Sequence, residues 1–475
     1  MIVEIVRYSF FKYIWLQMVF EAMGASRSRV LIVPMLDAVV QGAEDPPGLD
    51  FAGRKNRSWC ERVTMTRSGA KPPHRSILRI FGPAASSLMV ASGLGFVYWV
   101  VAARLYTPEQ VGTSGATLSL ISGIGVASSG GLYAVLLRAL AAHGDPRRLH
   151  LMTCAAVAAV AGVVGLVVGL FHVGHASLSF AWLWFALLSA AWALFTLQDA
   201  ILISLRRTTV LFMSNVGFGV AKLVLLVAFA AAARGIVASW AIPLVIVVPI
   251  IAVLADRTIA RLPSRAIDPF TVTTEHVATE YVSSIAVVMI NSAVPVIVSS
   301  LRGGVFAGVV YVCWMLYIAA DSLGTILSSV VVSSATEHDL SAARAVASAR
   351  SAIPAIGGTL LAGIVFAPAI LKIFGGNYSD AVGLLRLVLL AVLIRMAGNL
   401  GLAGLRVNRQ FRRLAVAQMV SAVVTIVGVA IAAAHHSLAG IGWSAVAGAL
   451  VLVVLAMKAD VARALVEQSR DRLAS

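Results

Sequence analysis

The stretch "VLLAVLIRMAGNLGLAGLR", residues 388–406, is apolar enough to cross a lipid bilayer, yet it holds Arg395 near its middle. A spanning helix needs about 20 mostly apolar residues to cross the hydrocarbon core. A guanidinium keeps its charge in proteins, and at the centre of a bilayer it costs about 3 kcal/mol or more. The stretch therefore predicts a transmembrane helix whose arginine either binds a ligand or forms an ion pair.

The composition of the whole chain extends this prediction beyond one helix. Of its 475 residues, 60% are hydrophobic and only 12% are charged, and the mean hydropathy is +0.92. A soluble protein carries roughly 25% charged residues. The apolar residues form long runs with short polar breaks, whereas a membrane β-barrel would show short alternating segments. We therefore predict an all-α polytopic membrane protein.

Twelve runs are long enough to span. The longest break between them, 257–276, follows the sixth run, so we predict two six-helix bundles, 76–256 and 277–459, and a tail at 460–475. Two equal halves are typical of transporters built from structural repeats. The predicted spans are residues 82–104, 112–140, 151–171, 178–203, 209–232, 236–255, 277–300, 304–333, 351–372, 381–404, 414–434 and 438–457.

The loops between these runs alternate in charge, with fourteen cations in one set and four in the other. Short loops rich in Lys and Arg stay in the cytoplasm, so both termini are predicted to be cytoplasmic. The first set holds Arg138, Arg147, Arg148, Arg206, Arg207, Arg257, Arg261, Arg265, Arg344, Arg350, Arg406, Arg409, Arg412 and Arg413. The second set holds Arg104, Arg234, Arg302 and Lys372.

Residues 1–75 do not fit this plan. The segment "SFFKYIWLQMVF", residues 9–20, is apolar but too short to span and contains Lys12. We expect residues 1–75 to be a disordered extension or one that results from a mis-called start. Met65 opens a short basic segment that resembles a cytoplasmic start, so residues 1–64 are expected to be dispensable.

Two arginines share the tenth predicted span. Arg386 and Arg395 are nine positions apart, which places them on opposite faces of a regular helix. Arg386 lies about 8 Å from the nearer end, so its stem can carry the charge to the interface. Arg395 lies too deep for that and shares its face with Asn399. We expect Arg395 to face a polar cavity or to pair with an acid.

Four further residues break the apolar pattern, and intramembrane ionisable groups are functional candidates by default. Asn215 and Lys222 lie seven residues apart on one face of the fifth span, which favours a cavity wall over a simple charge pair. Asp321 in the eighth span either pairs with a cation such as Lys222 or Arg395, or titrates as a coupling site. Glu280 begins the seventh span and is a second coupling candidate.

Other classes of function find little support. The net charge of +16 is spread over short loops and makes no patch for nucleic acid. Three cysteines give neither a disulfide framework nor metal spacing. No loop is large enough to hold an active site, and no cofactor motif occurs. We therefore predict a protein that is not an enzyme and that needs no cofactor.

Three segments resemble a known family. "GFVYWVVAARLYTPEQVGTSGATLSLISGIG" (95–125), "APAILKIFGGNYSDAVGLLRLVLLAVLIR" (367–395) and "HSLAGIGWSAVAGALVLV" (436–453) look like parts of bacterial polysaccharide and O-antigen flippases. These belong to the multidrug, oligosaccharidyl-lipid and polysaccharide exporter superfamily. The resemblance covers about 80–459, and its motifs are loose and mostly structural.

The resemblance implies two bundles rocking around a central cavity in the bacterial plasma membrane. The implied substrate is an undecaprenyl-diphosphate-linked oligosaccharide, and the implied partners are membrane lipids and a membrane glycan polymerase. Arg395 and Lys222 match the counter-charges of a diphosphate by their chemistry, with Asn399, Asn215 and Arg386 as further contacts. The alternative is a drug or metabolite exporter of the same superfamily, driven by proton or sodium through Asp321 and Glu280.

Overall fold

The computed structural model describes residues 75–139, 146–173, 181–205, 207–232, 234–260, 274–338 and 352–457. The N-terminal extension up to residue 74, most of the predicted linker 257–276 and the tail 460–475 lie outside these ranges. The predicted domain boundaries therefore stay predictions.

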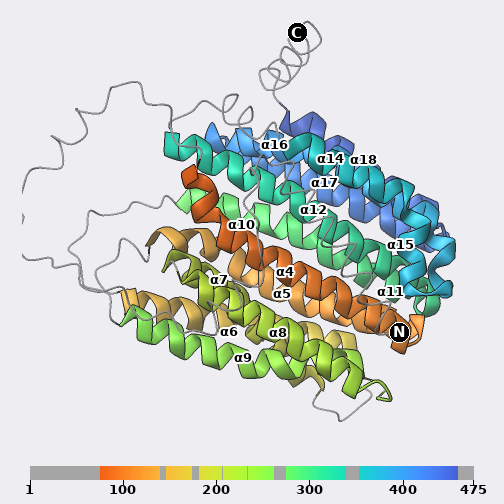
Figure 1. The fold of residues 1–475 in the computed structure, drawn as a ribbon, viewed down its shortest axis with the longest axis horizontal. Helices are drawn as coiled ribbons and strands as arrows, with labels where there is room; N and C mark the ends of the chain where they lie inside the picture. The colour runs from red at the N-terminus through yellow and green to blue at the C-terminus, as the bar shows by residue number, and fades with distance from the viewer. Residues whose placement is uncertain are drawn as a thin grey trace, which may run out of the picture. The chain divides into compact units, whose positions relative to one another are not determined.

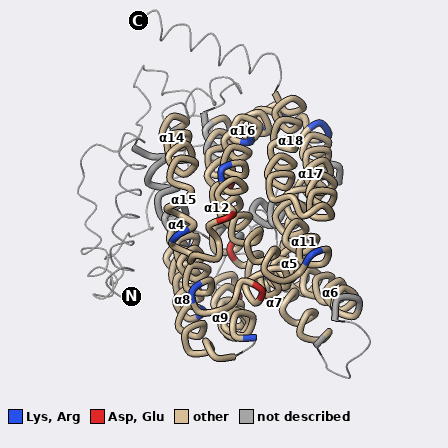
Figure 2. Tube along the Cα trace, turned by 90° about the vertical axis from the view of Figure 1, so that its right-hand side faces the viewer, with Lys and Arg blue, Asp and Glu red and all other residues tan. Residues whose placement is uncertain are grey.

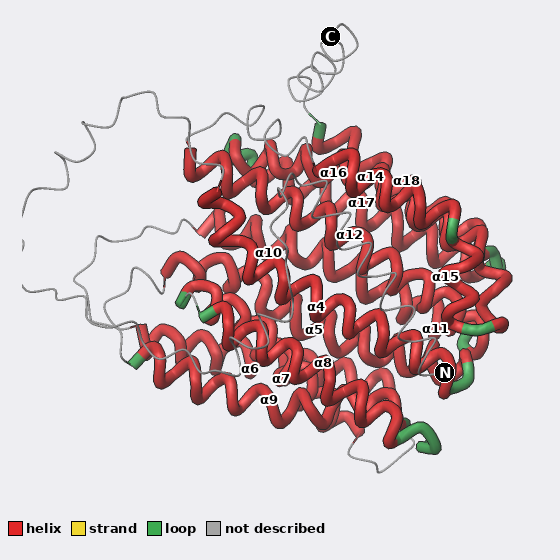
Figure 3. The backbone as a smooth tube through the Cα atoms, in the orientation of Figure 1, coloured by secondary structure: helices red, strands yellow, loops and turns green. Residues whose placement is uncertain are grey.

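The secondary structure of the described residues consists of helices joined by short turns, with no strand among them (Figures 1 and 3). This confirms the predicted all-α class. The helices of the first half are α4 (Arg75–Leu105), α5 (Pro108–Ala139), α6 (Pro146–Val173), α7 (Ala181–Ser204), α8 (Thr208–Ala228) and α9 (Gly235–Ile259). Those of the second half are α10 (Thr274–Val288), the π-helical η1 (Met289–Ala293), α11 (Val294–Arg302), α12 (Gly304–His338), α14 (Ala352–Val365), α15 (Ala367–Phe374), the 3₁₀-helical η2 (Gly376–Ala381), α16 (Val382–Val407), α17 (Phe411–Ala434) and α18 (Leu438–Ala456).

Each of the twelve predicted spans overlaps one helix or one broken helix. Among the described residues, ten helices are long and apolar enough to cross a membrane, and the bent pair α14–α15 brings the number to eleven. The last part of α4, Val90–Leu105, is a shorter apolar helix. The chain is thus a multi-pass membrane protein.

Two of the predicted spans are irregular helices. The seventh passes through the π-helical turn η1 just before Pro295, and the ninth bends by 69° between α14 and α15. The bend has a simple cause, because Pro368 has no N–H for the carbonyl of Ile364 four residues earlier. Proline thus ends the hydrogen-bond ladder of α14.

Helix α5 connects the two halves of the chain. It packs against α7 of its own half and against α10, α11 and α12 of the other. Small residues permit this approach: a Cβ on Gly115 would lie 2.6 Å from the Tyr311 ring, and one on Gly123 would lie 2.7 Å from Ser292. Small residues on this face of α5 thus let its backbone pack closely against α10 and α12.

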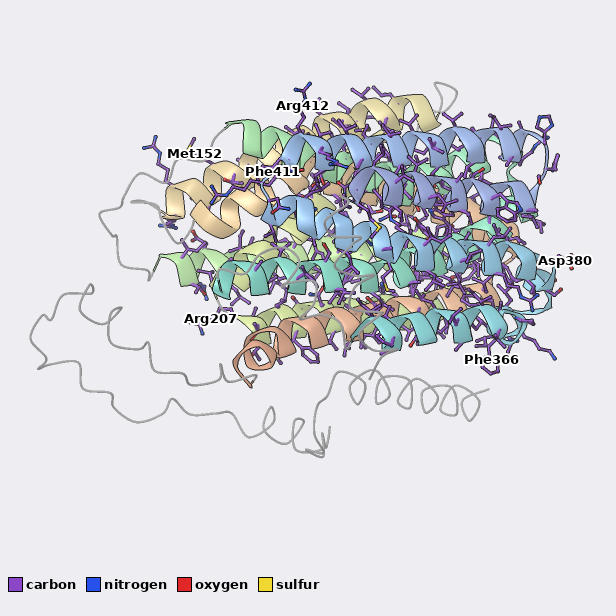
Figure 4. The ribbon with its side chains drawn as sticks, turned by 90° about the horizontal axis from the view of Figure 1, so that it is seen from above. Met152, Arg207, Phe366, Asp380, Phe411 and Arg412 are labelled. Carbon is purple, nitrogen blue, oxygen red and sulfur yellow. The ribbon has the colours of Figure 1, made fainter. Side chains whose placement is uncertain are left out.

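The helices run between two ends that differ in charge. Figure 4 shows Arg207 and Met152 toward one end and Phe366 and Asp380 toward the other. We call the end with Arg207 the α7–α8 end and the opposite end the α4–α5 end, because the turns between these pairs of helices lie there. Lys and Arg (blue) and Asp and Glu (red) are few among the described residues of the helices (Figure 2). The outward faces carry large apolar side chains, such as Val224 and Val454, as lipid contact requires.

Candidate functional site

A buried ion pair joins α12 to α16. The Nε atom of Arg395 lies 3.1 Å from Oδ1 of Asp321, and it donates a hydrogen bond of 3.2 Å to Oδ2. One turn further along α16, Asn399 Nδ2 donates to Oδ1 of the same carboxylate over 3.3 Å. Arg395 is 3% exposed and Asp321 is 8% exposed. The structure therefore brings together three of the predicted site residues.

The far side of the guanidinium is also held. Nη1 of Arg395 donates to Oγ of Ser421 on α17 over 3.5 Å, and Ser421 in turn donates to the carbonyl of Gly448 on α18 over 2.8 Å. Four helices thus meet at one charged cluster. A buried pair of this kind is destabilising when one partner is removed, because the other charge is left without compensation.

Helix geometry explains why Arg395 and not Arg386 enters this cluster. The two side chains project from opposite faces of α16: Arg395 is buried and Arg386 is exposed. Of the two alternatives for Asp321, the contacts fit pairing with Arg395. Hydropathy alone could not decide this, since it does not show which helices are neighbours.

Lys222 on α8 has a different environment. Its Nζ atom lies 5.1 Å from the ring centroids of both Tyr98 on α4 and Phe218 on its own helix. Aromatic faces attract a cation at this distance. No described residue makes a hydrogen bond or an ion pair with Lys222. The residue is half-buried, so its charge has no carboxylate partner in this part of the molecule.

An acid of the first half, Asp199, was not among the site residues predicted from the sequence. Asp199 on α7 is half-buried, and its carboxylate is hydrogen-bonded by the side chain of Asn215. Asn215 also donates to the Leu211 carbonyl of its own helix over 3.1 Å. The signal was present in the sequence, because "LFTLQDAILIS", residues 194–204, places one carboxylate inside an apolar run. Asn215 therefore touches an acid as well as sharing a face with Lys222.

Arg386 belongs to neither group. Its Nε atom donates to the carbonyl of Ile364 over 3.3 Å. This is the carbonyl that Pro368 leaves without an intrahelical donor, so Arg386 satisfies it at the bend between α14 and α15. The remaining candidate, Glu280, lies near the middle of α10. Its side chain is outside the described part of the structure.

Neither models of protein families nor the sequences of curated proteins match this chain. Solved structures do match it in fold. One is the lipid II flippase MurJ in an inward closed conformation, with a TM-score of 0.59 and 11% identity over 78% of this chain and 86% of that one.

Two further matches are conformations of a multidrug resistance MATE family transporter of the MOP superfamily. The inward-facing one has a TM-score of 0.54 and 14% identity, covering 81% of this chain and 96% of that one. The outward-facing one has a TM-score of 0.53 and 15% identity, covering 83% and 96%. The chain therefore has the fold of MOP superfamily transporters. Identities this low show the fold and leave the substrate open.

Proposed function

We propose that this protein moves an undecaprenyl-diphosphate-linked oligosaccharide across the plasma membrane by alternating access, for the synthesis of a surface polysaccharide. The observation that carries the proposal is Lys222, a cation within a membrane span that no described carboxylate neutralises. A cation at such a depth is costly unless it serves a ligand or a partner. A diphosphate would supply the missing negative charge.

The surroundings of Lys222 suit this task. The Tyr98 and Phe218 rings favour the charged form of the ammonium without occupying its hydrogen bonds. An ammonium has three donors, and phosphate oxygens are strong acceptors. Asn215, seven residues earlier on the same helix, is engaged with Asp199 and with a backbone carbonyl of that helix, so its amide would have to leave one of them to reach the same ligand.

The role of Arg395 in this proposal is secondary. Its guanidinium is engaged by Asp321 and Ser421, so a diphosphate would have to displace the carboxylate to reach it. Asn399 is likewise engaged with Asp321. Arg386 is exposed and keeps donors beyond the one bound to Ile364, so it remains a proposed contact for lipid phosphate.

The orientation follows the charges. We propose that the α7–α8 end, with Arg207, faces the cytoplasm of a bacterial cell, and that both termini lie on that side. Single cysteines at Gly376 and Asn408, both exposed, test this in a variant without native cysteines. An impermeant maleimide added to intact cells should label the first and spare the second, and the reverse would overturn the orientation.

Transport itself should be measured with the purified full-length chain in proteoliposomes. The probe is a fluorescent undecaprenyl-diphosphate-linked oligosaccharide whose glycan becomes accessible to an added glycosidase only after translocation. We expect Lys222→Gln to lose at least about tenfold in rate and Lys222→Arg to retain part of it. Lys372→Gln is the matched control, because Lys372 is exposed at the α4–α5 end. Equal rates for Lys222→Gln and wild type would refute the proposal.

A second function is favoured by Asp199. Its carboxylate has an amide neighbour, so it is a better candidate for a coupling acid than the ion-paired Asp321. In a proton- or sodium-coupled exporter of drugs or metabolites, Asp199→Asn would abolish uptake of a cationic dye driven by a pH or sodium gradient. Such uptake by the wild type, with no translocation of the glycolipid, would favour this alternative.

A further inference from the structure

At the α4–α5 end, an arginine of the first half binds the end of a helix of the second half. Arg104, in the last turn of α4, donates from Nε to the carbonyl of Ile373 over 2.7 Å and from Nη2 to the carbonyl of Lys372 over 2.9 Å. These carbonyls lie in the last turn of α15, where no further helical N–H follows. A helix C-terminus carries partial negative charge, so a guanidinium fits there.

Two aromatic contacts join the same two halves near this end. Phe96 packs edge-on against Phe374, with ring centroids 5.6 Å apart. Trp99 packs against Tyr311 at 4.6 Å, and both are largely buried. Aromatic pairs in this geometry add to the stability of a contact beyond the area they bury.

The closest approach is between two backbones. A Cβ added to Gly112 at the start of α5 would lie 2.5 Å from the amide nitrogen of Gly308 on α12. A Cβ on Gly308 would collide with the carbonyl of Pro108. Only glycine at both positions permits α5 and α12 to meet here.

We propose that these contacts form a latch, with Arg104 as its polar clasp, and that the latch holds the α4–α5 end closed between the two halves. The aromatic pairs and the glycine contact shape the closed interface. The two hydrogen bonds of Arg104 must break before α4 and α15 can separate. Arg104 acts by positioning α15 and does not need to touch the substrate, so the latch is independent of the identity of the substrate.

The chain contains a matched control for this clasp. Arg302 at the end of α11 also donates to carbonyls at a helix end, those of Ala433 and Ala434 on α17. Both arginines are exposed, and both cap the last turn of a helix. Arg302, however, joins two helices of the second half, so its loss should leave the contact between the halves intact.

The test uses accessibility of a buried position beside the glycine contact. Ala307 is 3% exposed and adjoins Gly112, so a single cysteine at residue 307 in a variant free of Cys60, Cys154 and Cys313 measures opening. We expect Arg104→Ala to raise the rate of labelling by a hydrophilic maleimide about three- to tenfold, in line with two exposed charged hydrogen bonds. Arg104→Lys, which keeps the charge and loses the fork, should lie between.

The outcomes separate a latch from a general loss of structure. Arg302→Ala should leave the rate within about twofold of the parent, and Gly112→Ala should raise it as Arg104→Ala does. Thermal stability of each purified variant is measured alongside. An unchanged rate in Arg104→Ala, or an equal rise in Arg302→Ala, would overturn the proposal.

Discussion

Lys222 and Arg395 are both cations in membrane spans, and the fold treats them in opposite ways. Arg395 in the second half is closed in by Asp321, Asn399 and Ser421. Lys222 in the first half has two aromatic rings and no described acid. A buried ion pair makes the packing of its helices depend on both partners, whereas a charge without a counter-ion is available to a ligand. The comparison therefore distinguishes the two cations by their contacts, which depth in the membrane alone does not do.

The largest expected effect is on the paired cation. Arg395→Gln leaves Asp321 as a buried charge without its main partner, so we expect a loss of about 3–5 kcal/mol in stability. The measurement is the temperature at which half of the purified protein has aggregated, and we expect it to be lower in the variant than in the wild type. Asp321→Asn should cost a similar amount, since it strands the guanidinium.

The double variant Arg395→Gln/Asp321→Asn should recover most of that loss, because no charge remains unpaired. Arg386→Gln, on the opposite face of the same helix, is the control. Recovery absent in the double variant would mean that Arg395 has a role apart from Asp321, and the contrast with Lys222 would fail.

A smaller effect, with no loss of stability, is expected when Lys222 is replaced. Lys222→Met removes a lone charge from a half-buried apolar site and also removes two cation–π contacts of about 1 kcal/mol each at most. We therefore expect stability to stay the same or to rise by about 1 kcal/mol, in the same thermal assay. A loss as large as that of Arg395→Gln would show that Lys222 is a structural cation too.

The smallest effect concerns the third cation, Arg386. Arg386→Gln should cost about 0.5 kcal/mol, since its hydrogen bond to Ile364 is long and exposed. The cost should vanish in a Pro368→Ala background, where residue 368 regains the N–H that Ile364 lacks. A double-mutant cycle by thermal unfolding measures this coupling. Additive losses would show that Arg386 does not serve the bend.

Much of the fold could be predicted from sequence, because the length and polarity of each span depend on local residues alone. The opposite orientations of Arg386 and Arg395 followed from their nine-residue spacing. The bend of the ninth span was missed, although Pro368 was visible, because hydropathy averages over the break.

The candidate site was less predictable. Asp321 had two possible cations as partners, and only the contact of α12 with α16 selects Arg395. Asp199 was passed over because its importance depends on Asn215, which lies on the next helix. Partners on different helices are fixed by packing, and a single sequence carries no direct signal of packing.

Helix α15 has only eight residues and lies between the bend at Phe366 and Gly375, whose φ of 130° suits glycine. So short a helix holds about four internal hydrogen bonds. It can therefore unwind locally while α14 and α16 keep their structure. In heavy water the amide protons of α15 would exchange for deuterium well before those of the long helices beside it. The exchange would be faster still whenever the hydrogen bonds from Arg104 to the last turn of α15 are broken.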